Sequence, residues 1–331
     1  MKIKIPELEK LVVDVLRTEY TTEQADRMKD VVLFGELSGR PSHGILRLLK
    51  GNYGVFVEGK REDPEYTHKT PVSTLIDSKR NPGMLIGPFA MEEAIRLAKE
   101  HGIGIVGTKA SFNSIGSLSY YCEQIAKHNY IGIIMAQASP QTAPFNTVKP
   151  LFGSNPIAFC FPNDPNPIMF DMSTTVMTYG TIMKYHAEGK TLPPNIAFDE
   201  KGNKTMDPAK ALKGATLPFD KSYKGSGLAM MVEFLGSLWP GGSYEGLHYD
   251  TDGWGNLFMV FSPDLLSDAA SLKTKVKEFM TTLKNAPTTD GNPVRVPGEN
   301  TLSIRDKNLA AGEIEISDVI YQKIQEQLRN K

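Results

Sequence analysis

The chain has only two cysteines, Cys122 and Cys160, among its 331 residues. Two thiols are too few for a disulfide framework and lack the spacing of a metal-binding pair, so we expect a reducing compartment and assign the thiols no chemical role. Long apolar runs are also missing, because Glu233 interrupts the richest stretch, residues 228–239. A membrane span needs about 18 or more consecutive apolar residues. We therefore predict that this stretch is a buried globular helix and that no membrane is a partner.

A net charge of one sign is absent too, since 37 lysines and arginines almost balance 38 aspartates and glutamates. This balance creates no broad field that would attract nucleic acid or an anionic membrane, so the expected partner is a small molecule. Residues 1–6 show neither the apolar core nor the cleavage site of a signal peptide. We therefore expect a cytoplasmic protein.

Several motifs of nucleotide, metal and nucleophile sites are missing from the sequence: the P-loop, a zinc pattern of histidine and cysteine, and the G-x-S-x-G elbow. Residues 102–107 match the dinucleotide fingerprint G-x-G-x-x-G in letters. That fingerprint must follow a strand and open a helix, whereas here a predicted helix precedes the glycines and a strand runs through them. Gly102 is better explained as the residue that ends the helix. Any cofactor site must therefore be built elsewhere.

The length of the chain and its changing pattern predict two unequal parts. Residues 6–34 have apolar side chains at helical spacing, and Thr21 or Thr22 is placed to cap a second helix. After a charged loop at residues 60–71, short β-branched runs alternate with helices, which indicates α/β organisation. The predicted strands are residues 72–76, 103–106, 131–136, 157–161 and 168–170, and the predicted later helices are residues 89–101, 117–128, 228–238, 271–284 and 316–328, with a loop through residues 297–300.

Residues 38–47 place a histidine at a tight turn and an arginine four residues later. At this spacing His43 and Arg47 can face one pocket. Reduction of a 2-oxo acid needs a proton donor beside the carbonyl oxygen, and a histidine that titrates near ~6.5 suits that task. It also needs a fixed cation, and an arginine can hold a carboxylate with two hydrogen bonds. The alternative is a surface turn in which Ser42 caps a helix and Arg47 is solvated.

Two further segments are candidate binding sites. Residues 222–227 lead into a predicted helix, so unpaired backbone N–H groups beside Lys224 form a candidate anion site. The alternative is a glycine-rich turn with a structural role. Residues 170–174 follow a strand and offer a carboxylate, that of Asp171, and hydroxyls to a ribose or to a backbone turn. The remaining histidines are predicted to lie in loops or at helix ends without a chemical role: His68, His101, His128, His186 and His248.

Taken together, these segments resemble the malate/L-lactate dehydrogenase family that is unrelated to the Rossmann-type enzymes. The resemblance runs over nearly the whole chain, and the order of the motifs carries it. The matching stretches are Ser42-His43-Gly44 with Arg47, and residues 101–104, 150–156, 171–174, 205–208, 221–227 and 297–299. Any one of these stretches is a weak signal, but seven in the same order are a specific one.

The resemblance implies an NAD(P)-dependent enzyme with its own α/β fold: a non-Rossmann cofactor domain with a mixed sheet flanked by helices, and a helical portion from both termini. Residues 1–72 and 301–331 would form that helical portion with the Ser-His-Gly turn, and residues 73–300 the cofactor domain. The resemblance also implies a homodimer with its active site near the subunit boundary. NAD is the preferred cofactor over NADP.

Roles of individual residues also follow from the resemblance. His43 is the implied general acid and base, Arg47 the carboxylate anchor, and Ser42 a neighbour that orients either. The implied cofactor contacts are Asp171, Met172, Ser173, Thr174, Tyr223, Lys224, Gly225, Gly298, Glu299 and Asn300.

One position departs from the family. Many members have a histidine after Ser-Asn, whereas this chain reads Asn113-Ser114, and a serine hydroxyl is too weak an acid to replace an imidazole. Either His43 alone serves or the activity is altered. Asn113, in the segment that departs from the family, is an expected substrate contact. Residues 137–145 resemble the substrate-side loop of the family, so Thr142 is the other expected substrate contact. Residues 146–148 depart from the usual glycines of that loop.

The function expected from these residues is hydride transfer between the cofactor and a small 2-oxo or 2-hydroxy acid, with malate and oxaloacetate as the first candidates. The distal carboxylate of malate would need a second cation, for which the candidates are Arg40, Lys109, Lys149 and Lys184. One alternative is a reductase of a cyclic imino acid or a diketo sugar acid. Another is a catalytically silent family member that binds the cofactor.

Overall fold

A computed structural model describes residues 1–51, 54–57, 59, 61–243 and 253–329. Its main feature is a seven-stranded sheet in the order β2-β3-β4-β10-β5-β6-β7. Among these strands, β3 and β4 pair in parallel and the other neighbours pair antiparallel, so the predicted mixed α/β fold is confirmed. The strands are β2 (Glu65–Thr70), β3 (Ser73–Asp77), β4 (Ile103–Ser111), β5 (Ile131–Ala136), β6 (Ile157–Phe161), β7 (Ile168–Met172) and β10 (Trp254–Phe261).

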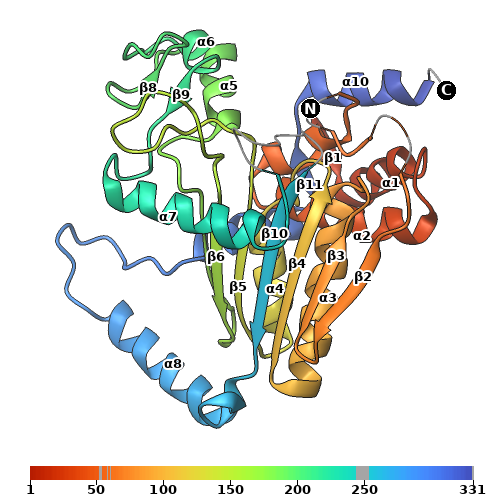
Figure 1. Cartoon of the computed structure of the whole chain (residues 1–331), viewed down its shortest axis with the longest axis vertical. Helices are drawn as coiled ribbons and strands as arrows, with labels where there is room; N and C mark the ends of the chain where they lie inside the picture. Colours follow the sequence, from red (N-terminus) through yellow and green to blue (C-terminus); the bar gives the residue numbers. More distant parts are fainter. Residues whose placement is uncertain (52–53, 58, 60, 244–252, 330–331) are drawn as a thin grey trace.

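Helices lie on both faces of this sheet. The helices α3 (Gly83–His101) and α4 (Leu118–Lys127) pack behind it in the view of Figure 1, while α7 (Tyr223–Glu233) crosses its front. The core is continuous from these layers to the N-terminal helices, and Tyr121 and Phe258 are among its largest fully buried side chains. As predicted, Gly102 ends α3 in the left-handed conformation and β4 runs through the glycines that follow.

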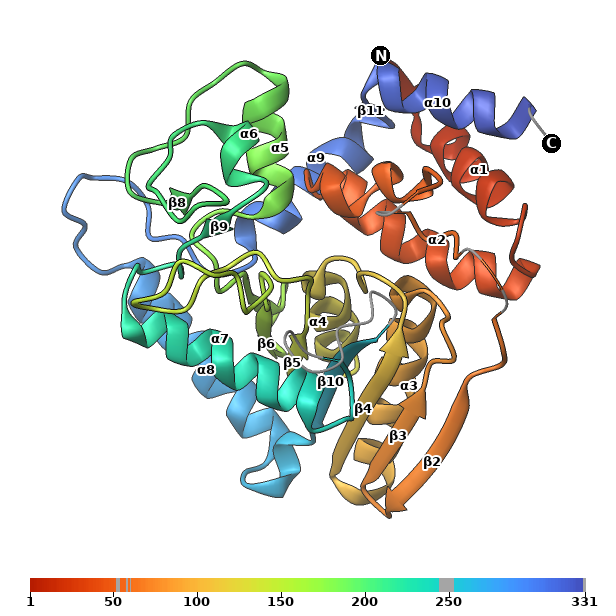
Figure 2. The same cartoon turned by 45° about the horizontal axis from the view of Figure 1, so that its top comes forward.

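The helical portion comes from both ends of the chain, as Figure 2 shows. Strand β1 (Lys2–Lys4) pairs with β11 (Glu313–Glu315), which brings α1 (Ile5–Leu16) and α2 (Thr22–Leu37) beside α9 (Glu299–Ala311) and α10 (Asp318–Arg329). Of the two predicted caps, Thr21 is the one used. Its hydroxyl accepts from the N–H of Gln24 at 3.3 Å, and the Gln24 side chain accepts in return from the N–H of Thr21 at 3.1 Å.

A smaller lobe was not anticipated from the sequence. It contains α5 (Tyr179–Ala187), α6 (Pro208–Ala211) and the two-stranded sheet of β8 (Ala197–Phe198) and β9 (Ala215–Thr216). The lobe has its own core, formed by Ile182, Leu192, Ile196, Ala197 and Ala211. Its elements are too short to produce a clear periodic pattern, which explains why the sequence did not predict them.

Several predicted elements need correction. The expected loop at residues 60–71 contains β2, an edge strand whose polar side chains hide the alternation of a buried strand. The expected loop through residue 300 ends earlier, because Glu299 already begins α9. Helix α8 (Ala269–Lys284) matches its prediction within two residues, yet none of its residues is buried.

The apolar stretch at residues 228–239 is also not the fully buried helix that we expected. Its first half belongs to α7, and its second half is a π-helical turn, η3 (Phe234–Leu238). The face of η3 that packs on the sheet is buried, but Phe234 is 43% exposed and Trp239 is 62% exposed. The stretch is therefore amphipathic, with an apolar side on the surface.

Candidate active site

The Ser42-His43-Gly44 turn is built against the C-terminal end of α2. Two short 3-10 turns, η1 (Pro41–His43) and η2 (Ile45–Leu48), carry His43 and Arg47. A β-carbon at Gly35 of α2 would lie 2.4 Å from the carbonyl oxygen of His43. Only glycine permits this approach of helix to turn, so the position of the turn is set by backbone contact.

The buried carboxylate of Glu36 holds the same turn through a hydrogen bond. Oε2 of Glu36 accepts a hydrogen bond from the N–H of Ile45 at 2.9 Å, between the two predicted catalytic residues. A β-carbon at Gly44 would lie 1.9 Å from this oxygen, so the carboxylate occupies the space over the glycine. Burial raises the pKa of Glu36, and the Ile45 N–H counteracts part of that rise.

His43 is a half-buried residue whose imidazole is affected by the charges of two guanidinium groups. Desolvation, followed by the positive charges of Arg47 and Arg40, lowers the pKa of His43 to about 3. Its Nδ1 atom is buried and has no hydrogen-bond partner among the described residues. This pKa lies well below the value near 6.5 that we expected, so the imidazole is neutral in the free protein.

Arg47 and Asn113, both predicted to contact the substrate, lie within hydrogen-bond distance of each other. The Arg47 Nε atom donates to the Ser42 carbonyl oxygen at 2.8 Å, and Nη1 donates to Asn113 Oδ1 at 3.3 Å. Asn113 adopts a left-handed backbone with φ 62° and donates from Nδ2 to the Gly54 carbonyl at 3.2 Å. The structure thus orients the guanidinium from its own turn and from the loop after β4. The backbone N–H of Gly116 donates to the hydroxyl of Ser114, which therefore shapes that loop.

Ser42 faces the smaller lobe, and Thr142 is closed off from solvent. A β-carbon at Gly180 of α5 would lie 3.3 Å from the Ser42 β-carbon. Thr142 is fully buried, and its hydroxyl lies 3.4 Å from that of Thr216. In this conformation Thr142 anchors residues 137–145 to the segment of Thr216. The contact of Thr142 with a substrate stays a prediction.

The predicted cofactor segments converge on strand β7. The Met169 N–H donates to the Pro297 carbonyl at 3.2 Å, which places residues 297–300 beside the strand. At the other end of the strand, the Phe219 N–H donates to the Thr174 carbonyl at 2.9 Å, which places the start of α7 there. Gly298 precedes α9, and Glu299 pairs with Lys284. Asn300 is exposed on the first turn of α9.

The side chains at the end of β7 and directly after it have structural partners. Oδ2 of Asp171 accepts from the Ser119 N–H at 3.0 Å and the Ser119 hydroxyl at 2.7 Å, and it lies 3.4 Å from Arg40. Buried Thr174 donates to the Ser154 carbonyl at 3.1 Å, and the Ser173 hydroxyl donates to the same oxygen at 3.2 Å. The partly exposed Met172 and Ser173 are the members of this segment that remain accessible.

The anion site predicted at the start of α7 needs correction. The N–H of Lys224 donates to the Ser222 hydroxyl at 3.1 Å, and the N–H of Gly225 donates to Asp220 Oδ1 at 3.1 Å. These amides are therefore capped, and the aspartate adds a negative charge beside them. The side chains of Tyr223 and Lys224 are exposed and remain accessible to a ligand.

The candidates for a second cation differ in their partners. Arg40 pairs with Asp171, Lys109 with Asp77 at 3.3 Å, and Lys184 with Glu188 at 3.8 Å. Lys149 is exposed, and no ion pair of it is found in the described part of the chain.

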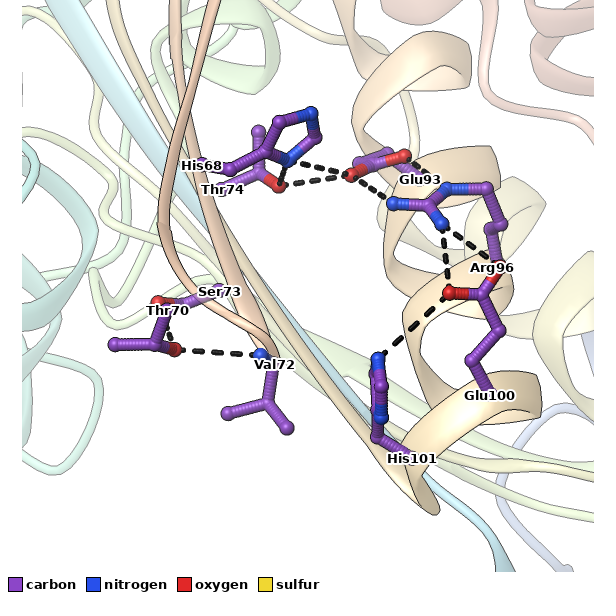
Figure 3. Close-up of polar contacts among 9 residues, drawn as sticks. All are labelled: His68, Thr70, Val72, Ser73, Thr74, Glu93, Arg96, Glu100 and His101. Atoms are coloured by element: carbon purple, nitrogen blue, oxygen red, sulfur yellow. Dashed lines mark hydrogen bonds and ion pairs between the residues drawn. The ribbon is translucent and has the colours of Figure 1, made fainter.

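The predicted bystander histidines are placed largely as expected, with one exception. His68 lies on β2, where Nδ1 is 2.9 Å from the Thr74 hydroxyl and 3.6 Å from Glu93. Figure 3 shows this contact as part of a polar cluster with Arg96 and Glu100 on α3. His248 lies outside the described residues. Within those residues, no group of three or more histidine, cysteine, aspartate or glutamate side chains could hold a metal ion.

Sequence reasoning missed the buried groups that support the site. Glu36 gave no signal because an isolated glutamate in a helical pattern predicts an exposed position. Glu233 lies in the apolar stretch of residues 228–239 and Asn155 in the matching stretch of residues 150–156, and neither was assigned a role.

Among the helices of the described residues, none has the length and apolar composition that crossing a membrane requires.

With the mixed sheet and the His43–Arg47 turn described, comparison with known proteins identifies the family of the chain. The pattern of the family described as malate/L-lactate dehydrogenase matches residues 3–325. The chain therefore belongs to this family of NAD(P)-dependent 2-hydroxy acid dehydrogenases.

Individual relatives cover almost the full length of the chain. It is 31% identical to L-sulfolactate dehydrogenase of Methanocaldococcus jannaschii, over 98% of this chain and 96% of the relative. It is 29% identical to ureidoglycolate dehydrogenase (NAD(+)) of Escherichia coli K12, over 97% and 94%. A solved sulfolactate dehydrogenase from M. jannaschii superimposes with a TM-score of 0.87 at 30% identity, over 100% of this chain and 97% of that chain.

Proposed function

We propose that the protein interconverts a small 2-oxo acid and its 2-hydroxy acid, with oxaloacetate and malate as the first candidates and NAD as the preferred cofactor. The observation that supports this proposal best is the shared turn of His43 and Arg47. The buried, unpartnered Nδ1 of His43 lies beside a guanidinium that Ser42 and Asn113 orient. A proton donor next to a fixed cation is what a 2-oxo acid requires.

The residues around β7 fit a dinucleotide in their chemistry. The exposed ring of Tyr223 can stack on a base or a ribose, and the Lys224 ammonium can pair with a phosphate. Gly298, Glu299 and Asn300 follow Pro297, which pairs with Met169 of β7. When bound, the reduced nicotinamide supplies a hydride to the carbonyl carbon.

Proton supply is the task of this chain's own residues. In the free protein, desolvation and then the charges of Arg47 and Arg40 keep the imidazole of His43 neutral. A substrate carboxylate that pairs with Arg47 offsets one of these charges and raises the pKa of His43. His43 then takes up a proton and donates it to the oxygen that was the carbonyl. Proton uptake is thereby coupled to binding of the anion.

The test is NADH and NADPH oxidation with a panel of 2-oxo acids. We expect turnover by the wild type and loss of about 100-fold or more of kcat in His43→Ala, with nucleotide binding retained. Binding is measured separately, by nucleotide fluorescence. A fully active His43→Ala removes the acid assignment. Nucleotide binding without turnover on any acid supports the silent alternative raised by Ser114.

A second candidate substrate class is a diketo sugar acid or a cyclic imino acid. The observation that favours it is the pairing of Arg40, Lys109 and Lys184 with carboxylates of the chain. These pairings leave less positive charge for a second carboxylate. Including both classes in the panel, beside oxaloacetate, separates the alternatives by kcat/KM.

We also propose that the protein is a cytoplasmic homodimer with the active site near the subunit boundary. Large apolar side chains are exposed on two helices and directly after η3, and burying them against a second copy would remove them from water. They include Met230 and Met231 on α7, Trp239 after η3, and Phe279 on α8. Light scattering after size exclusion tests the dimer, and a concentration-independent monomer would contradict it.

A further inference from the structure

A buried carboxylate near the C-terminal end of α7 has no role in the chemistry proposed above. Glu233 is 6% exposed, and no ion pair of Glu233 with a lysine, arginine or histidine is found among the described residues. Burial raises the pKa of this carboxyl, while hydrogen bonds from Asn155 and Gln137 lower it. A buried charge without a counter-ion is costly, so its position calls for a specific function.

Each carboxylate oxygen of Glu233 accepts one hydrogen bond from a side-chain amide. Oε1 accepts from Gln137 Nε2 at 2.9 Å, and Oε2 accepts from Asn155 Nδ2 at 2.6 Å. Both partners are donors, so the position between them requires two acceptors. A carboxylate meets that requirement, and a carboxamide does not.

The orientation of both amides is fixed by their other ends. Oε1 of Gln137 accepts from the Ser237 hydroxyl at 2.7 Å and from the Gly255 N–H at 3.2 Å. Oδ1 of Asn155 accepts from the Ala138 N–H at 3.3 Å. Turning either amide would place its NH2 group against these donors. The network therefore has one consistent arrangement of donors and acceptors.

The π-helical turn η3 brings the network together. The Trp239 N–H donates to the Phe234 carbonyl at 2.9 Å, one residue further than in an α-helix. The wider turn follows Glu233 directly and contains Ser237, and both side chains reach Gln137. A π-turn inside a helix is frequently found at a functional site.

The members of the network belong to the segments that resemble the family's binding loops. Gln137 and Ala138 begin the substrate-side loop, and Glu233 ends the helix that starts at Tyr223. Asn155 follows Ser154, whose carbonyl accepts from Ser173 and Thr174 of the cofactor segment. One carboxylate thus connects three segments that are far apart in the sequence.

We propose that Glu233 is a positioning residue, which holds the substrate-side loop, the 150–156 loop and the cofactor helix in one register. This inference rests on the proposed function, because it assigns the network to the dehydrogenase site. Nucleotide binding should therefore depend on a side chain at position 233 that accepts hydrogen bonds from both amides. A variant whose side chain has the same volume but does not accept both should bind the nucleotide more weakly.

The first variant is Glu233→Gln, which keeps the shape but places an NH2 group against one of the two donors. We expect NADH or NADPH, whichever the wild type binds, to bind about tenfold or more weakly in a fluorescence titration well below Tm. The second variant is Glu233→Gln with Asn155→Asp. In this pair the new amide at position 233 accepts from Gln137 and donates to the new carboxylate at position 155, so the contact between the two positions returns. The hydrogen bond from Asn155 Nδ2 to the Ala229 carbonyl at 3.2 Å is lost, so we expect binding tighter than in Glu233→Gln and within about fivefold of wild type.

The matched control is Glu93→Gln on α3. Figure 3 shows that Glu93 also joins two elements, accepting from the Thr74 hydroxyl at 2.8 Å and pairing with Arg96. It lies near β3, whereas the cofactor segments converge on β7 at the other edge of the sheet. We expect its nucleotide binding to equal that of the wild type, whatever happens to its Tm.

The outcomes separate the two proposals. A wild type that binds neither nucleotide overturns the proposed function and this inference with it. A folded Glu233→Gln that binds as tightly as wild type overturns the inference alone. If Glu233→Gln does not fold, the double variant decides: restored folding with restored binding supports the positioning role. A double variant that is unfolded, or that folds and binds more than about fivefold more weakly than wild type, overturns it, because the restored contact between positions 233 and 155 should hold the register.

Discussion

Two buried polar regions of the molecule differ in how completely their hydrogen bonds are satisfied. Around the His43 turn, a buried ring nitrogen has no partner in the described residues, and two like charges flank the imidazole. Around Glu233, both carboxylate oxygens have partners. Native interiors leave few polar atoms unpaired, so the first arrangement is the unusual one.

The difference teaches which region performs chemistry and which supports it. An unsatisfied, destabilised group is ready to gain a partner, and a substrate can supply that partner. A satisfied network has nothing to gain and instead resists displacement of its segments. Changes in the turn should therefore affect turnover or substrate affinity, and changes in the network should affect nucleotide binding.

The largest effect on substrate affinity is expected from Arg47→Met. The variant keeps an apolar side chain of similar length but loses the charged pair of hydrogen bonds with the substrate carboxylate. We expect KM for the 2-oxo acid to rise about 100-fold, with a smaller change in kcat, since charged hydrogen bonds contribute about 1.5–3 kcal/mol each. Steady-state kinetics measure it. Arg96→Met on α3 is the matched control, and an equal rise there would contradict the anchor role.

The titration of His43 is the next test. We expect a midpoint near pH 3 for His43 in the free protein, observed by NMR of the labelled imidazole, instead of the ordinary value near 6.5. Because the pKa in the folded state is below the unfolded value, this group contributes stability above about pH 6.5 that is lost as pH falls toward about 3. In Arg47→Met the midpoint should move upward. A free-state midpoint near 6.5 would contradict the coupling of protonation to anion binding.

The fold was predictable where the pattern of the sequence is regular. Alternating and apolar runs predicted β5 and β6 at their observed bounds, and the glycine at position 102 predicted the end of α3. Strand β2 was missed because it is an exposed edge, whose polar side chains show no buried face. The smaller lobe was missed because its stability comes from contacts between short elements distant in sequence.

The site was predictable at the level of residue types in one short segment. His43 and Arg47 are four residues apart, and the structure places them on two successive turns of the same segment. The shifted pKa of His43 was not predictable, because it depends on burial and on Arg40, whose direction the sequence does not specify. The capped start of α7 was missed for a similar reason: Asp220 folds back onto the N–H of Gly225.

Glu36 gives a smaller effect and tests whether the turn depends on its support. In Glu36→Leu the N–H of Ile45 loses its partner, which costs about 1–3 kcal/mol of unfolding free energy. We expect kcat to fall about tenfold because the imidazole loses its fixed position. Glu36→Gln keeps an acceptor oxygen and should remain within about threefold of wild type. Urea unfolding and kinetics measure the two quantities, and equal kcat values for both variants would contradict the supporting role.

The smallest effect is expected at Gly102, which tests the misleading dinucleotide fingerprint. Its φ is 81°, and an added β-carbon would lie 2.6 Å from Leu265 Cδ2, so Gly102→Ala should lower the unfolding free energy by about 1–2 kcal/mol. Gly312→Ala is the control, because that residue ends α9 with φ 68° and has nothing within 4 Å of the added carbon. The difference between the two isolates the clash with Leu265.

Nucleotide binding distinguishes the two interpretations of Gly102. If residues 102–107 cradled a pyrophosphate, a methyl group on the first glycine would weaken nucleotide binding together with stability. Because the glycines instead end α3 and run through β4, we expect Gly102→Ala to bind the nucleotide as the wild type does in a fluorescence titration. Loss of binding at a temperature where the variant is folded would place the cofactor at this turn and not at β7. The network around Glu233 would then have no expected effect on nucleotide binding.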